Sequence, residues 1–239
     1  MVASHFGSIG FTFGDQQEFA VGVGELVRAG VVHRLDEEER DHIWTDASGA
    51  RTVILMRGGS VQEMLPCLVA GAEPVKVRQA VMLDVEVAKV SLLTDDGEDI
   101  CPLLIELEDR ALLSRVGKLD EGRLHLAALA EEIVVHTDAD AYYASQDGDG
   151  PKFAADHLIP AGMFGPEPRA LAMLAAEVID AHSRTNTVTG VPFHWLRVRG
   201  ICGIEFDVAV QHDLLAVVPE PGNVVSGSFF MTGCLGLDY

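Results

Sequence analysis

The fold is decided in residues 165–210, which read GPEPRALAMLAAEVIDAHSRTNTVTGVPFHWLRVRGICGIEFDVAV. The Gly-Pro pair at the start is typical of a helix N-terminus, because proline lacks an N–H that would have no partner there. Apolar residues then recur at helical spacing as far as His182, where a run rich in Thr, Asn and Ser begins. This pattern predicts a helix. Residues 193–199 and 203–210 alternate with period two, which predicts a two-stranded hairpin.

The hairpin is expected to have one apolar and one charged face. Facing residues of an antiparallel pair share a face. For the apolar residues of both strands to lie on one face, the loop must have an odd number of residues, most simply Gly200-Ile201-Cys202. The charged face then carries five binding candidates: Trp195, Arg197, Arg199, Glu205 and Asp207. Two interpretations stay open. The face is solvent exposed, with cross-strand ion pairs such as Arg197 with Glu205, or it is a polar floor that attracts an anion beneath a pocket.

A weaker copy of this unit lies near the N-terminus. Five residues recur at constant spacing: Phe13, Gly14, Val27, Trp44 and Gly49 match Phe164, Gly165, Val178, Trp195 and Gly200. In the first copy, Asp15 is suited to cap a helix, with Glu18 three residues later as in a capping box. A hairpin is expected around residues 48–50. The order of strand, helix and hairpin in both copies predicts an internal duplication.

The residues between the two copies indicate β-structure. Residues 75–83, 88–93 and 100–107 alternate as in an antiparallel meander. Residues 124–135 fit either a helix or a strand, and the strand is preferred. A short helix is expected at residues 138–145.

These patterns together predict an α+β fold. It has mainly antiparallel sheets, two principal helices and a duplicated strand–helix–hairpin unit. We expect one domain over residues 1–239, with repeat-like halves at 1–71 and 153–239 and a β-meander insertion at 72–150. The polar stretch at 147–151 is the best candidate for the join between the halves.

Composition limits the classes of partner. The chain has 239 residues and a formal net charge of −20, which disfavours binding to nucleic-acid phosphates or anionic membranes. No stretch approaches the ~20 apolar residues of a membrane-spanning helix. The first residues, MVASHFGSIG, lack the basic start and apolar middle of a signal peptide. We therefore expect a cytoplasmic protein, with a homodimer through an edge strand or a Trp-bearing face as one option.

No catalytic or cofactor motif is complete. Sequences at Gly7 (GSIG) and Ser226 (SGS) fall short of the G-x-S-x-G nucleophile elbow. A phosphate-binding Gly-Lys-Ser/Thr loop is absent from the sequence, and the nine histidines include no H-E-x-x-H motif. The sequence therefore predicts no cofactor.

His5 and His157 each stand at the start of one half, and Glu63 lies near the last strand of the first half. This layout of strand, helix and three strands resembles the glyoxalase or vicinal-oxygen-chelate group of metalloproteins. The resemblance implies one divalent metal held by His5, His157 and Glu63, with Glu205 as a base or ligand. The second half departs from that pattern, because its last strand, residues 224–235, has no carboxylate.

Two functions compete as hypotheses. The first is a non-enzymatic protein that binds a ligand or a partner, and it is favoured because no catalytic motif is complete. The second is a metal-dependent enzyme of the vicinal-oxygen-chelate type. A weaker idea is that Arg197 and Arg199, roughly 6.6 Å apart along one strand face, bind a small anion. That idea requires that the two arginines are not both paired to Glu205 and Asp207.

Overall fold

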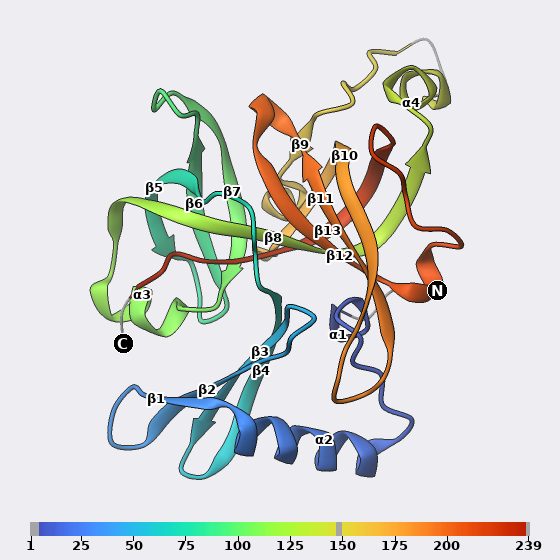
Figure 1. The fold of residues 1–239 in the computed structure, drawn as a ribbon. Helices are drawn as coiled ribbons and strands as arrows, with labels where there is room; N and C mark the ends of the chain where they lie inside the picture. Colours follow the sequence, from blue (N-terminus) through green and yellow to red (C-terminus); the bar gives the residue numbers. More distant parts are fainter. Residues whose placement is uncertain (1–4, 147–149, 238–239) are drawn as a thin grey trace.

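The computed structural model of the protein describes residues 5–146 and 150–237 (Figure 1). Within these ranges the chain forms thirteen strands and only four α-helices, of which α2 (Gln16–Ala29) is the longest. The fold is therefore mostly β, and the predicted α+β class with two principal helices is wrong. Residues 147–149, in the expected join between the halves, lie outside the described residues.

A four-stranded antiparallel sheet forms the N-terminal part of the molecule, with α2 packed against it (Figure 1). Its strands, in spatial order, are β1 (Val31–Arg34), β2 (Glu39–Thr45), β3 (Ala50–Arg57) and β4 (Ser60–Leu68). The predicted hairpin is confirmed as β2 and β3. The predicted cap is also confirmed, because the Asp15 carboxylate accepts hydrogen bonds from the backbone N–H groups of Gln17 and Glu18.

The other nine strands form a mixed sheet. They are β5 (Val75–Met82), β6 (Val87–Leu93), β7 (Asp99–Leu107), β8 (Leu119–His136), β9 (Leu158–Ile159), β10 (Leu171–Thr185), β11 (Pro192–Arg199), β12 (Glu205–Gln211) and β13 (Val224–Cys234). The predicted meander is confirmed as β5 to β7, and the preference for a strand at 124–135 is confirmed as part of β8. The short helix expected at 138–145 is α4 (Ala139–Ser145).

The hydrogen-bonded pairs of the large sheet close two rings that share the long pair β8–β13 (Figure 1). One ring runs through β8, β5, β6, β7 and β13. The other runs through β8, β12, β11, β10 and β13. Strands β8 and β13 therefore belong to both rings.

Two apolar clusters fill most of the interior. The larger one is built by strands of the nine-stranded sheet. The smaller one fills the contact between the two sheets, which we call the seam, and it includes both tryptophans, Trp44 of β2 and Trp195 of β11. Leu65 of β4 and Phe230 of β13 also belong to it. The seam is where residues far apart in the sequence meet.

The segment predicted as the second helix is strand β10. Leu174, Ala176 and Val178 alternate into the larger cluster, whereas Met173 is exposed. Alanines occupy both faces, so the apolar positions also match helical spacing. Pairing with β11 on one side and β13 on the other satisfies the backbone of β10 and outweighs the helix propensity of its alanines.

The predicted duplication is wrong for the same reason. The residues of the second unit that align with helix α2 form β10, so the two units fold differently. The strand expected before α2 is also wrong, because the chain there forms the short helix α1 (His5–Ser8). No helix in residues 5–146 and 150–237 has the length and apolar character needed to cross a membrane.

Candidate functional site

Two pockets open along the seam. The glutamate pocket, about 450 Å³, is lined by Glu63, Glu86, Glu106, Glu131, His5 and Arg169, and by apolar side chains that include Phe6, Met64, Leu171 and Phe230. The arginine pocket, about 870 Å³, is lined by Asp46, Ser48, His182, Arg184, Trp195, Arg197 and Asp207, among others. Both pockets take side chains from both sheets, so both depend on how the sheets pack together.

An irregularity in the β8–β13 pair sets the direction of Glu131. The register shifts at this residue, which leaves Glu131 without a partner across the ladder. Gly227 of β13 allows the close approach, since a Cβ there would lie 1.9 Å from the carbonyl oxygen of Glu132. The Glu131 carboxylate accepts hydrogen bonds from His5 Nε2 at 2.9 Å and Ser228 Oγ at 3.1 Å. Bulges often re-aim side chains in this way, and here the result is a fixed carboxylate.

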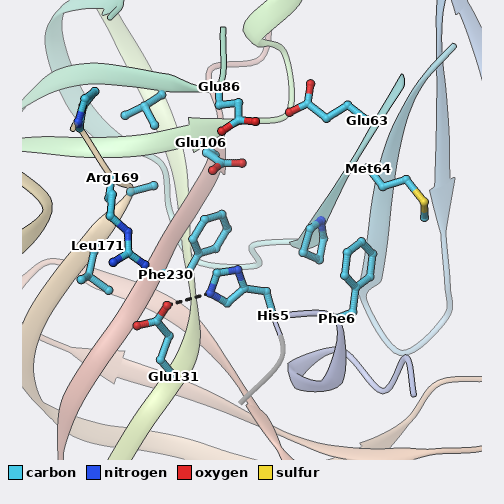
Figure 2. Close-up of a pocket in the computed structure, with 14 residues that line it drawn as sticks. His5, Phe6, Glu63, Met64, Glu86, Glu106, Glu131, Arg169, Leu171 and Phe230 are labelled. Atoms are coloured by element: carbon cyan, nitrogen blue, oxygen red, sulfur yellow. Dashed lines mark hydrogen bonds and ion pairs between the residues drawn. The ribbon is translucent and has the colours of Figure 1, made fainter. Parts of the chain in front are cut away.

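His5 connects this carboxylate to the apolar wall of the pocket. Its ring stacks on Phe230, with the ring centroids 4.1 Å apart. The hydrogen bond from His5 lowers the pKa of Glu131, although burial opposes this effect. In Figure 2 the Phe230 ring lies between this His5–Glu131 pair and the carboxyl of Glu106.

Three further carboxyl groups gather at the opposite end of the pocket (Figure 2). Glu63 comes from β4, Glu106 from β7, and Glu86 from the turn between β5 and β6. Arg110, the first residue of α3 (Arg110–Val116), is 8% exposed and contacts two of them. Its Nη2 lies 2.6 Å from a Glu63 oxygen, and its Nη1 lies 3.6 Å from a Glu106 oxygen. One buried guanidinium therefore serves two carboxyl groups.

Burial and neighbouring charges raise the pKa values of Glu106 and Glu63. Burial raises the pKa of Glu106 to about 7, against the opposing effect of Arg110. The nearby charges of Glu86 and Glu63 raise it further. Burial also raises the pKa of Glu63. Glu106 is thus divided between its neutral and ionised forms near neutral pH, and a positive charge in the pocket would shift it to the ionised form.

The arginine pocket is built around Trp195. The Cζ atoms of Arg184 and Arg197 lie 4.2 Å and 5.6 Å from the centre of the Trp195 ring. The ring of His182 lies 4.6 Å from the same ring. Contacts at these distances fall in the range of cation–π interactions, so the indole holds two guanidinium groups at one pocket.

The structure confirms which residues of the β11–β12 hairpin share a face. Arg197 faces Asp207 and Arg199 faces Glu205 across the two strands. The predicted three-residue loop and the Arg197–Glu205 pair are wrong, because the loop extends over residues 200–204 and shifts the register by two positions. A loop with an odd number of residues leaves the same residues on each face. The predicted faces are therefore correct, although the predicted register is wrong by two positions.

The five predicted binding candidates do not lie together. Trp195, Arg197 and Asp207 line the arginine pocket. Arg199 and Glu205 lie beyond its lining and form an ion pair at 2.9 Å with partly exposed side chains. Arg197 and Arg199 each pair with a carboxylate. An anion site made of these two arginines required that they were not both paired, so the structure argues against it.

The weak metal candidates also separate. His5 and Glu63 line the glutamate pocket. His157 lies elsewhere, with its Nδ1 2.8 Å from the carbonyl oxygen of Ala154 and its ring packed on Phe153. The described residues contain no group of three or more His, Cys, Asp or Glu side chains placed to hold a metal ion.

Sequence reasoning missed Arg184, Glu106 and Glu131. A signal existed for two of them, because Glu106 and Glu131 each interrupt a largely apolar strand. Arg184 gave no such signal, since it lies in a polar run that is typical of the end of a helix. Comparison of the chain with protein-family models, curated proteins and solved structures gave no match. The resemblance to the vicinal-oxygen-chelate group stays a prediction.

Proposed function

We propose that the protein is a non-enzymatic binding protein whose ligand is a small organic cation, a primary ammonium group on an apolar body, held in the glutamate pocket. The observation that carries this proposal is the convergence of four glutamates on one cavity. Two of them share the single guanidinium of Arg110. A third, Glu131, is fixed by His5 and Ser228, and Glu86 is exposed at the rim.

The electrostatics of the pocket favour a cationic ligand. Glu63, Glu86 and Glu106 repel one another, as the raised pKa of Glu106 reflects after the larger effect of its burial. An ammonium ion among them would relieve that repulsion and donate hydrogen bonds to carboxylate oxygens. Binding is therefore expected to release a proton from Glu106.

The apolar wall argues for an organic cation over a bare ion. Phe6, Met64, Leu171 and Phe230 line the same cavity as the carboxyl groups. Ligand pockets of roughly 300–1,000 Å³ typically combine an apolar lining with a few polar groups that fix orientation. A ring or short aliphatic chain fits the wall, while its ammonium group reaches the glutamates.

Calorimetric titration with benzylamine tests this proposal. Benzyl alcohol, which has the same ring without the charge, is the ligand control. Because the pKa of Glu106 is about 7, the affinity for benzylamine is expected to rise about tenfold from about pH 6 to about pH 8. Equal binding of the amine and the alcohol would contradict a charge-directed site.

Two matched variants place the effect in the pocket. Glu106→Gln is expected to weaken benzylamine binding at about pH 8 by about tenfold, or ~1.4 kcal/mol, and to abolish the pH dependence. Glu132→Gln removes the same charge from an exposed neighbour of Glu131 that does not line the pocket, and it should leave binding unchanged. If both variants behave alike, general charge and not this pocket attracts the amine.

The alternative, a metal-dependent enzyme, keeps one observation in its favour: His5 and Glu63, two of its three expected ligands, line the same pocket. Metal analysis of the purified protein separates the two functions. A stoichiometric divalent ion that is lost in His5→Ala would support the enzyme, and a metal-free protein that binds benzylamine would support the proposal above.

A further inference from the structure

We propose that the arginine pocket is a second and independent ligand site, which binds a small molecule bearing an oxyanion, a carboxylate or a phosphate. Its two guanidinium groups come from neighbouring strands, Arg184 from β10 and Arg197 from β11. Arg197 forms an ion pair with Asp207, whereas Arg184 has only neutral hydrogen-bond partners among the described residues. The pocket can therefore accept an anion.

Arg184 has no carboxylate partner in the described part of the chain. Its Nε donates to His182 Nε2 at 3.1 Å, and its Nη1 donates to the carbonyl oxygen of Ser48 at 3.0 Å. Both acceptors are neutral, because the His182 nitrogen can accept this bond only when it carries no proton. Arg184 is half-buried and lines the pocket. Only the more distant carboxylates of Asp207 and Asp180 act on its charge, so the guanidinium can still pair directly with an anionic ligand.

Arg197 supplies a second guanidinium in a fixed orientation. Its Nε donates to one oxygen of Asp207 at 2.5 Å, and the other oxygen of Asp207 accepts from the backbone N–H of Gly71. Asp207 is 1% exposed, and each of its two oxygens already accepts one of these hydrogen bonds. Among the residues described, the terminal nitrogens of Arg197 make no hydrogen bond.

Trp195 joins the two guanidinium groups. The indole is 7% exposed, and its Nε1–H is buried without a hydrogen-bond partner among residues 5–146 and 150–237. An indole that contacts both cations limits their freedom before any ligand arrives. Planar guanidinium groups held in this way suit two-point recognition of a carboxylate or phosphate.

Asp46, the other carboxylate of the lining, does not neutralise Arg184. It accepts hydrogen bonds from the backbone N–H and hydroxyl groups of both Ser48 and Thr187. Burial by itself would raise the pKa of Asp46, but these hydrogen bonds outweigh it and lower the pKa. Burial also lowers the pKa of Arg184, and an oxyanion beside this guanidinium would oppose that effect.

Fluorescence of Trp195 provides a direct readout. The chain has only two tryptophans, so the variant Trp44→Phe leaves Trp195 as the single reporter. We expect a saturable change in its emission with benzoate or with inorganic phosphate at constant ionic strength, and none with chloride. The probe that saturates identifies the oxyanion. A change that is linear in concentration, or that chloride reproduces, overturns the proposal.

Substitutions at Arg184 locate the site. In the Trp44→Phe background, Arg184→Met is expected to weaken the oxyanion at least tenfold, and Arg184→Lys to weaken it less because the charge remains. Arg199→Met is the matched control, since Arg199 lies on the same face of β11 outside the pocket lining. Circular dichroism checks that each variant is folded. Equal weakening by Arg184→Met and Arg199→Met, or no effect of either, overturns the proposal.

The two sites are separable in one protein. Arg184→Met should leave benzylamine binding unchanged, because Arg184 does not line the glutamate pocket. A loss of benzylamine binding in that variant would mean that one site, and not two, accounts for the observations.

Discussion

The glutamate pocket and the arginine pocket lie along the same seam, and packing balances the charges that line them in different ways. In the glutamate pocket, Glu63 and Glu106 share the buried guanidinium of Arg110. In the arginine pocket, Asp207 pairs with Arg197, and Arg184 has only neutral hydrogen-bond partners among the described residues.

The difference shows what a net charge of −20 does and does not decide. It disfavours large anionic partners at long range, but it says little about a single pocket. What matters locally is which charges lack a partner once the sheets have packed. By that criterion a strongly acidic chain can hold a site for a cation and a site for an anion.

The largest expected effect is the loss of Arg110. Arg110→Met leaves the carboxyl groups of Glu63 and Glu106 partly buried without their cation, which should lower the free energy of unfolding by about 3 kcal/mol. Urea unfolding measures this change. A loss below about 1 kcal/mol would mean that Arg110 behaves as a surface ion pair and does not hold the glutamate pocket together.

A second prediction concerns the pH dependence of stability. Burial raises the pKa of Glu106 to about 7, so the folded state binds a proton that the unfolded state releases from about pH 4.5 upward. Stability from this group is present at low pH and falls as pH rises from about 4.5 to about 7, by up to about 3 kcal/mol. Glu106→Gln should remove this fall and unfold at higher urea than the wild type at about pH 8.

Identical pH profiles for Glu106→Gln and the wild type would show that Glu106 titrates as an ordinary surface carboxyl. Glu132→Gln serves as the control for removing one negative charge, because Glu132 is exposed. Its profile should follow that of the wild type.

The smallest effect is expected in the arginine pocket. Arg184→Met removes a guanidinium that forms no ion pair with a carboxylate among the described residues, so mainly its contact with Trp195 and its hydrogen bonds are lost, and stability should fall by about 1 kcal/mol or less. Arg199→Met, which breaks an exposed pair with Glu205, should change it by less than about 1 kcal/mol. A loss for Arg184→Met as large as that for Arg110→Met would show that the two pockets are balanced alike.

The strands and the pairing of faces could be predicted where alternation is clear. The β11–β12 hairpin followed from period two, and its faces survived a register error because the loop stayed odd. Strand β10 could not be predicted in the same way, since its alanines fit both a helix and a strand. Its secondary structure is set by pairing with β11 and β13, which lie on either side of it.

The pockets were harder to predict than the strands. Trp195, Arg197 and Asp207 are near one another in sequence and on one face, so part of the arginine pocket was found. The glutamate pocket joins His5, Glu63, Glu106 and Glu131 from separate elements. Only the packing of two sheets brings these residues together, and no spacing in the sequence encodes that contact.

The most direct test of the central claim, that the seam holds two separate sites of opposite charge, is a pair of calorimetric titrations. Benzylamine is titrated into protein saturated with benzoate or phosphate, and the order is then reversed. We predict that each dissociation constant is the same with and without the other ligand, that Glu106→Gln weakens only the amine, and that Arg184→Met weakens only the oxyanion. Mutual exclusion of the two ligands, or one substitution that abolishes both, would contradict the claim.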